Sequence, residues 1–141
     1  MTAKEYLRSI RALDAEADAI RSAIQTAKSK LEGLGSPALS DMPKGGQQET
    51  LADGIAKLVD LQREWERTIG DYADRKRLAA GQIAELKDER HRVVLYNYYI
   101  AGLTFESTAV GLDKAYMTVC RWHGSALQEF DEKFKVFLEM L

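Results

Sequence analysis

The sequence predicts an all-α protein: a long antiparallel helical hairpin with a coiled-coil-like pattern, followed by a C-terminal helix-turn-helix with an extended recognition helix. Three observations indicate this fold. Of the 141 residues, 45% are hydrophobic and 30% are charged, which favours a folded chain over a disordered one. Apolar residues recur at alternating spacings of three and four along two long stretches. Both prolines, Pro37 and Pro43, lie in one short segment, so long helices are permitted on either side of it.

The first helix is predicted over residues 3–34, where two interleaved sets of apolar positions form one stripe. The first set is Ala3, Ile10, Ala17, Ile24 and Leu31, and the second is Tyr6, Leu13, Ile20, Ala27 and Leu34. Thr2 and Glu5 have the spacing of a capping box at the start of this helix. Gly33 and Gly35 are typical of its end.

A second helix is predicted to begin near Thr50, after a loop over residues 35–49 that is rich in glycine, proline and serine. The first set of positions on its stripe is Leu51, Leu58, Trp65, Tyr72, Ala79 and Leu86. The second set is Ile55, Gln62, Ile69, Lys76 and Ile83, of which two are polar. The polar Gln62 and Lys76 either set the register or mark positions that face solvent. The two helices are expected to pack antiparallel as a hairpin. Because two stripes cover each other only partly, we expect a third surface against them, from the C-terminal part or from another chain.

The pattern changes near residue 87, which divides the chain into a hairpin domain over residues 1–86 and a helix-turn-helix domain over residues 87–141. Residue types typical of helix ends bound the helices of the second domain. The predicted helices are 89–101 between Asp88 and Gly102, 105–112 after Thr104, and 115–138.

The stretch 105–124 has the spacing of a helix-turn-helix. Ala109 stands where two crossing helices approach closely and a larger side chain would clash. Asp113 stands at the turn, which needs a left-handed backbone that aspartate tolerates. The apolar contacts between the two helices are predicted to come from Leu112, Val119 and Trp122.

The stretch from Arg90 to Phe130 also resembles sigma factor region four, the domain that reads promoter DNA. The motifs that carry the resemblance are Arg92-Val93-Val94-Leu95, Tyr99, Gly102, Leu103-Thr104-Phe105-Glu106, Ala109 and Val119-Cys120-Arg121-Trp122-His123-Gly124-Ser125-Ala126-Leu127. The segments MTAKEYLRSIRALD and LADGIAKLVDLQREW resemble a family of small prophage proteins, similar in plan to the RinA and ArpU type of late phage transcription regulators. The resemblance covers nearly the whole chain except the loop, and it implies binding to double-stranded DNA.

Several positions depart from the pattern of the resembled family. Thr108 stands where isoleucine is usual, Asp113 where glycine is usual, and Ala115 where a serine normally caps the recognition helix. Tyr98 and Leu103 replace basic residues, and each cation missing near a phosphate removes part of the electrostatic affinity. With a net charge of -2, DNA binding has to come from a local surface, and the departures leave open whether this helix-turn-helix still binds DNA.

The candidate DNA-binding residues lie around the start of the recognition helix, the part that reaches base edges in such motifs. The residues expected to face the groove are Tyr116, Met117, Cys120 and Arg121, with Lys114 and Thr104 near phosphates. Among these, only the guanidinium of Arg121 can make a bidentate contact with guanine. The alternative for Met117 and Cys120 is burial in the core.

No catalytic residue, metal site or cofactor is expected. His91 and His123 lie on different predicted helices, without a cluster of cysteine or carboxylate at ligand spacing. No motif places a base beside Cys120, the single cysteine, and a lone cysteine favours a reducing compartment. We expect His123 on the helix surface, near phosphate.

We therefore expect a cytoplasmic, phage-type transcription regulator that binds promoter-like DNA. Its hairpin is expected to mediate homo-oligomerisation or to contact RNA polymerase, and the chain has no apolar run long enough for a membrane span. Two alternatives stay open: a DNA-binding phage assembly subunit similar to a small terminase, and a coiled-coil scaffold that does not bind DNA. A ring of many subunits favours the assembly subunit, and a monomer or dimer favours the regulator.

Overall fold

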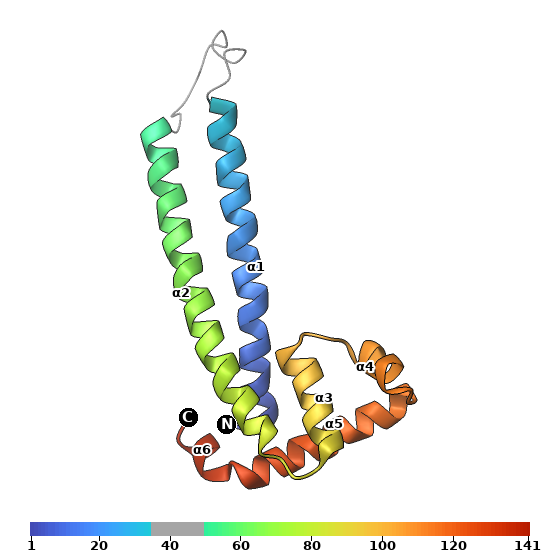
Figure 1. Cartoon of the computed structure of the whole chain (residues 1–141). Coiled ribbons are helices and arrows are strands. Elements are labelled where there is room, and N and C mark those ends of the chain that lie inside the picture. Colours follow the sequence, from blue (N-terminus) through green and yellow to red (C-terminus); the bar gives the residue numbers. More distant parts are fainter. Residues whose placement is uncertain (35–49) are drawn as a thin grey trace. The chain divides into compact units, whose positions relative to one another are not determined.

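The computed structural model describes residues 1–34 and 50–141, so the predicted loop over residues 35–49 lies outside the described residues (Figure 1). Every regular element in the two described ranges is helical, which confirms the all-α prediction. The elements are α1 (Ala3–Leu34), α2 (Leu51–Ala84), α3 (Glu89–Leu95), the π-helix η2 (Tyr96–Ile100), α4 (Phe105–Leu112), α5 (Tyr116–Lys133) and α6 (Lys135–Glu139). Among the described helices, none has the length and apolar character needed to cross a membrane.

Both long helices begin with a reciprocal capping box. The Glu5 backbone N–H donates to Thr2 Oγ1 at 3.2 Å, and the Thr2 N–H donates to Glu5 Oε2 at 2.9 Å. Thr50 and Asp53 repeat the arrangement at the start of α2, at 3.1 and 3.3 Å. Each pair satisfies two N–H groups that a helix start leaves without partners, so the predicted beginnings of both helices are confirmed.

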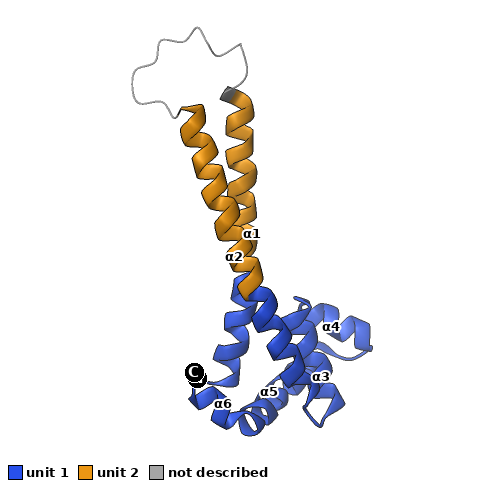
Figure 2. Ribbon diagram, turned by 60° about the vertical axis from the view of Figure 1, so that its left-hand side comes forward, with its two compact units in different colours: residues 1–14, 72–141 blue, residues 15–71 orange. Residues whose placement is uncertain are grey.

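The described chain divides into two compact units (Figure 2). Unit 1 comprises residues 1–14 and 72–141, and unit 2 comprises residues 15–71. Each unit therefore holds a part of α1 and a part of α2. This division does not coincide with the predicted domain boundary between residues 86 and 87, which stays a prediction.

The core of unit 1 joins the base of the helix pair to the C-terminal helices. Its buried residues are Ala3, Tyr6, Leu7 and Ile10 from α1, Ala79, Ile83 and Leu86 from α2 and the residues after it, and Leu95, Tyr99, Ile100, Ala126, Phe130 and Leu138 from the C-terminal part. Inside this core the Tyr6 hydroxyl donates to Gln82 Oε1 at 2.8 Å. The third surface expected against the two stripes is supplied here by α3, η2, α5 and α6.

Unit 2 consists of the two remaining helix segments, residues 15–34 and 50–71, packed against each other. Ala17 and Ile20 are buried, but most other stripe residues of this unit are only half-buried. Toward the start of α2 the apolar side chains are open to solvent, with Leu51 57% and Ile55 48% exposed. In unit 2 the stripes thus cover each other only partly.

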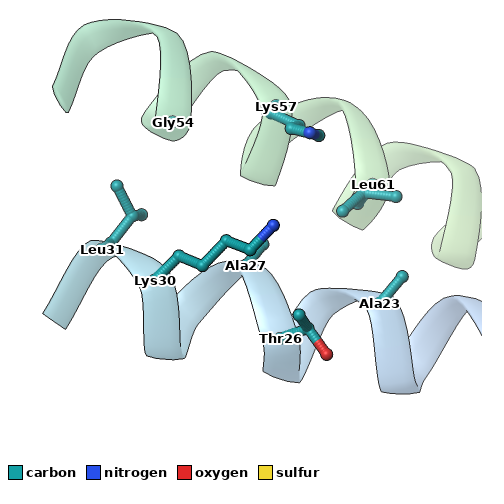
Figure 3. A pocket seen from close by; sticks show the side chains of 8 residues that line it. All are labelled: Ala23, Thr26, Ala27, Lys30, Leu31, Gly54, Lys57 and Leu61. Carbon is teal, nitrogen blue, oxygen red and sulfur yellow. The ribbon is translucent and has the colours of Figure 1, made fainter. Parts of the chain in front are cut away.

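The second apolar set of α2 is shifted in unit 2 from the predicted one. Gly54 is buried and Leu61 half-buried against α1, whereas Ile55 is exposed, so the predicted set is wrong by one residue at Ile55. Gln62 is exposed, as one of its two interpretations expected, and Ile69 is half-buried. Gly54 gives Leu31 its place at the helix surface: a Cβ at this position would lie 2.6 Å from Leu31 Cδ2, and that side chain would have to shift. Ala23 and Leu31 point from α1 toward α2 across a groove of about 290 Å³ (Figure 3).

The C-terminal helices follow the predicted boundaries with two differences. Asp88 caps α3 by accepting the Arg90 N–H at 2.9 Å, and Gly102, with φ 73°, ends the pair α3–η2. The last turn of this predicted helix is a π-helix, η2, rather than α-helix.

The predicted single helix over residues 115–138 is wrong, because it breaks at Phe134 with φ -110° and ψ 27°. The ring of Phe134 packs 4.7 Å from that of Phe130, and Leu138 is buried in the same core. Residues on both sides of the break, Phe130 and Leu138, are therefore buried in one core.

Candidate nucleic-acid interface

Thr104 and Thr108 build the start of α4. Thr104 Oγ1 accepts the Ser107 N–H at 3.0 Å, which confirms Thr104 as the N-cap. Thr108 is 2% exposed, and its hydroxyl donates to the Thr104 carbonyl at 3.0 Å. Threonine in place of the usual isoleucine therefore buries a hydroxyl that has a hydrogen-bond partner, which avoids the cost of an unsatisfied buried polar group.

The turn between α4 and α5 is left-handed at Asp113, with φ 54° and ψ 48°, as predicted. Two backbone hydrogen bonds close it: the Asp113 N–H donates to the Val110 carbonyl at 3.2 Å, and the Lys114 N–H to the Ala109 carbonyl at 3.0 Å. Aspartate thus takes the conformation that glycine usually supplies. Ala115 precedes α5 without a side-chain cap, so the first N–H groups of α5 have no side-chain acceptor from that residue.

A small separate core holds the two helices together. Val94 from α3, Ala109 from α4 and Val119 from α5 are buried in one cluster, with Phe105 and Trp122 packed against it. The predicted contacts of Val119 and Trp122 are confirmed, and Ala109 is buried in the same cluster, whereas Leu112 is half-buried and is not part of it. Val94 adds a third helix, α3, to the motif, so α4 and α5 are fixed against a support.

The candidate site residues lie on the solvent side of this motif. Four of them lie within the first two turns of α5: Tyr116, Met117, Cys120 and Arg121. Lys114 lies in the turn before α5, and Thr104 is the N-cap of α4. Five of the six are exposed, and Met117 is 60% exposed, so burial of Met117 in the core is wrong. Cys120 is half-buried, and a hydrogen bond between its thiol and the Tyr116 hydroxyl raises the pKa of Tyr116.

His123 is half-buried, which corrects the expectation that it lies openly on the helix surface, whereas its place near phosphate stays a prediction. Its Nε2 and the Tyr99 hydroxyl form a hydrogen bond of 2.8 Å, and its ring lies 4.8 Å from that of Phe105. Burial, together with the positive charges of Lys4 and Arg8, lowers the pKa of His123 to about 4. His123 is therefore neutral at pH 7 and belongs to the support behind the interface.

An arginine from α1 completes this support. Arg11 Cζ lies 3.9 Å from the centre of the Tyr98 ring, and its Nη1 donates to the Tyr98 carbonyl at 3.4 Å. Tyr98 in turn stacks on Phe105, the first residue of α4, with ring centres 4.3 Å apart. Sequence reasoning missed Arg11 because the contact spans the chain, although the aromatic run at residues 96–99 was a signal for a specific packing site.

Two acidic residues of α5, Glu129 and Asp131, have structural partners. Glu129 accepts the Lys87 N–H at 2.7 Å and lies 2.8 Å from His91 Nδ1. Burial raises the pKa of Glu129, but these hydrogen bonds outweigh it and leave the pKa lowered. Asp131 accepts the Ala3 N–H at 2.7 Å, at the start of α1. In the described ranges, no group of three or more His, Cys, Asp and Glu is arranged to hold a metal ion.

Comparisons of the chain with protein-family models, with curated proteins and with solved structures find no match. The resemblance to sigma factor region four and to small prophage proteins therefore stays a prediction from the residues quoted above. What the structure adds is the geometry of the candidate interface itself: a supported helix pair with a left-handed turn and an exposed face on α5.

Proposed function

We propose that this protein binds double-stranded DNA through α4 and α5 and acts as a transcription regulator of the phage type. The observation that carries the proposal is the buried Val94–Ala109–Val119 contact combined with the left-handed turn at Asp113. This combination fixes two helices in the manner of a helix-turn-helix, whose second helix enters the major groove. The resemblance to sigma factor region four supports the same assignment.

The chemistry of the exposed face suits base contacts by a few side chains. Arg121 is exposed, and no ion pair to it occurs among the described residues, so its guanidinium can approach a guanine. Tyr116 and Met117 offer apolar contact to thymine methyl groups. Lys114 and Thr104 are suited to phosphates.

The same face explains why we expect weak binding to random DNA. Glu106 and Asp113 are exposed acids at the start and end of α4, and they oppose the approach of phosphates. A strong site then requires further affinity, for which RNA polymerase or a second copy of this chain is the proposed source.

We also propose that the hairpin brings two or more copies together. The observation behind this is the flank of α2 formed by Leu51, Ile55 and Val59, which are exposed and spaced four residues apart. In the same unit the indole N–H of Trp65 is buried without a hydrogen-bond partner among the described residues. Sedimentation of the wild type at high concentration tests this proposal, and a strictly monomeric protein would exclude it.

The oligomer number also separates the regulator from the second candidate function, a phage assembly subunit similar to a small terminase. Both would use the same helix-turn-helix, and the exposed flank of α2 is the observation that keeps the second candidate open. A closed ring of many subunits favours assembly, whereas a dimer favours regulation.

DNA binding is tested by selecting a preferred duplex from random sequences and measuring fluorescence anisotropy at two salt concentrations. Arg121→Ala should weaken binding to the selected duplex by about 1–3 kcal/mol, with little change for random DNA. Lys114→Ala should weaken both alike and reduce the salt slope by about one unit. Lys135→Ala, an exposed lysine of α6, is the matched control and should behave as wild type.

Two outcomes would contradict the proposal. Equal binding of the selected duplex by wild type and Arg121→Ala would show that the groove-facing surface lies elsewhere. A wild-type protein that selects no sequence, alone or with RNA polymerase, would favour the scaffold that does not bind DNA.

A further inference from the structure

The first three turns of α1 carry a basic stripe, defined here as Lys4, Arg8 and Arg11. The spacings of four and three residues place the three cations on one side of the helix. Of the carboxylates in residues 1–14, Glu5 is engaged with Thr2 in the capping box, and Asp14 lies more than one turn beyond Arg8. Lys4 and Arg8 are both exposed, and within the described ranges neither forms an ion pair.

The stripe has a fixed position in unit 1 because α1 is docked there along the neighbouring side of the helix. Leu7 and Ile10 are fully buried, and the ring of Tyr6 lies 5.3 Å from that of Phe137. The Asp131 carboxylate of α5 accepts the first helical N–H, at Ala3. Lys4 and Arg8 therefore project from a helix whose first turns cannot move independently of α5.

Two observations place the stripe beside the residues that support α4 and α5. Lys4 and Arg8 lie close enough to His123, in the middle of α5, for their charges to lower its pKa. At the other end, Arg11 lies on the Tyr98 ring, and Phe105, the first residue of α4, stacks on that same ring. The stripe thus runs from the middle of α5 to the start of α4.

The three cations do not have equivalent roles. The guanidinium of Arg11 is held by the Tyr98 ring and carbonyl, near the end of η2, where a positive charge is favoured by the exposed helix carbonyls. Arg11 therefore positions α1 against the support of α4. Lys4 and Arg8, four residues apart, repel each other in the absence of an anion.

We propose that Lys4 and Arg8 contact the phosphates of the same duplex that α5 enters, so that α1 forms a flank of the DNA interface. This inference rests on the proposed function. It gives the net-negative chain the local positive surface that DNA binding needs, in a motif where Tyr98 and Leu103 replace basic residues of the resembled family. Phosphate contacts of this kind fix the orientation of the protein on the duplex without reading its sequence.

The test uses the full chain with Lys4→Gln and Arg8→Gln combined, and duplex binding by fluorescence anisotropy over a range of salt. We expect the salt slope to fall by about two units, because each phosphate contact contributes about 0.9. Affinity should fall equally for selected and random duplexes, so selectivity is retained. The matched control combines Arg77→Gln and Lys135→Gln, which removes two exposed charges elsewhere in unit 1 and should leave the slope unchanged.

A charge-preserving variant, Lys4→Arg with Arg8→Lys, should keep the wild-type slope, and circular dichroism checks that every variant is folded. If the wild type binds a selected duplex through Arg121 but the Lys4→Gln, Arg8→Gln slope equals that of wild type, the flank is overturned and the proposed function stands. If selectivity falls while the slope is unchanged, the two residues act through the fold, and the inference is also overturned. If the wild type binds no duplex, the proposed function fails first and the flank with it.

Discussion

Units 1 and 2 are built from the same two helices with the same apolar period, yet they bury that pattern differently. In unit 1 the stripe residues Ala3, Ile10, Ala79 and Ile83 are buried by the C-terminal helices. In unit 2 the corresponding positions are mostly half-buried, and the start of α2 exposes a row of apolar side chains.

The difference shows that a heptad stripe specifies which side of a helix is apolar but does not specify what covers it. Two helices bury one stripe against another, and the flanks of each stripe need a third partner. Unit 1 finds that partner within the chain. Unit 2 has no further segment among residues 15–34 and 50–71, which is why self-association is proposed for this unit.

The largest expected effect is the loss of stability when a leucine of α1 is replaced by alanine, compared between one site in unit 1 and one in unit 2. Leu7 is fully buried in unit 1, and Leu31 is half-buried in unit 2. Leu7→Ala should cost about 2–5 kcal/mol of the free energy of unfolding, as expected for a filled core position. Leu31→Ala should cost only about 1 kcal/mol, because less apolar area is lost from a half-exposed site. Urea denaturation followed by circular dichroism measures both.

Protein concentration is the control for this pair. A Leu31→Ala cost that equals the Leu7→Ala cost at low protein concentration would contradict the difference between the units. A Leu31→Ala cost that rises with protein concentration would instead show that a second copy covers the stripe of unit 2, since only an association equilibrium depends on concentration.

A smaller expected effect is the change of the free energy of unfolding with pH. It should arise in unit 1, which holds both histidines of the chain. Burial lowers the pKa of His123 in the folded protein to about 4, against about 6.5 in the unfolded chain. The neutral form of His123 therefore contributes its full stabilisation of the folded state above pH 6.5, and this stabilisation is lost as pH falls toward 4. Because His123 is partly exposed, we expect a loss of about 1–2 kcal/mol between pH 7 and 5.

His123→Gln removes the titrating group and should flatten stability between pH 7 and 5, measured by urea denaturation at each pH. The carboxylates with lowered pKa values, Asp88 and Glu129, do not interfere in this range. Their contributions are present above the pKa values of the unfolded chain and are lost only at lower pH. An unchanged slope in the variant would show that His123 is not the group responsible.

Local sequence signals predicted the local structure well. Thr2, Asp88 and Thr104 cap the helices that follow them, and Asp113 takes the left-handed conformation at the turn. Each of these features depends on contacts within a few residues along the chain, so residue type and spacing were sufficient. The buried contact of Ala109 with Val119 was likewise predictable, because a helix-turn-helix fixes the distance between them in sequence.

Features that depend on distant segments could not be predicted in this way. The break at Phe134 and the burial of His123 depend on which side chains of other helices lie opposite them. The contact of Arg11 with Tyr98 joins the first helix to the helix-turn-helix, and neither segment alone indicates the other. The one-residue shift at Gly54 depends on Leu31 across the hairpin. The candidate DNA-binding residues themselves remain predictions, now with known exposure.

The smallest expected effect is the change in stability when each of three glycines of α2 is replaced by alanine. Comparing the three separates local helix propensity from packing. Gly70 in unit 2 and Gly81 in unit 1 have no atom within 4 Å of an added Cβ, so alanine should stabilise each by about 0.5–1 kcal/mol. Gly54→Ala places its Cβ 2.6 Å from Leu31 Cδ2, and the displacement of that flexible side chain should offset the gain. Thermal denaturation of the three single variants measures the order of their gains in stability. Equal gains at Gly70 and Gly81 would show that propensity acts alike in both units, so that their difference comes from covering partners alone. A larger gain at Gly54 than at Gly70 would mean that Leu31 is not packed at the helix surface, and the shifted register of unit 2 would then be wrong.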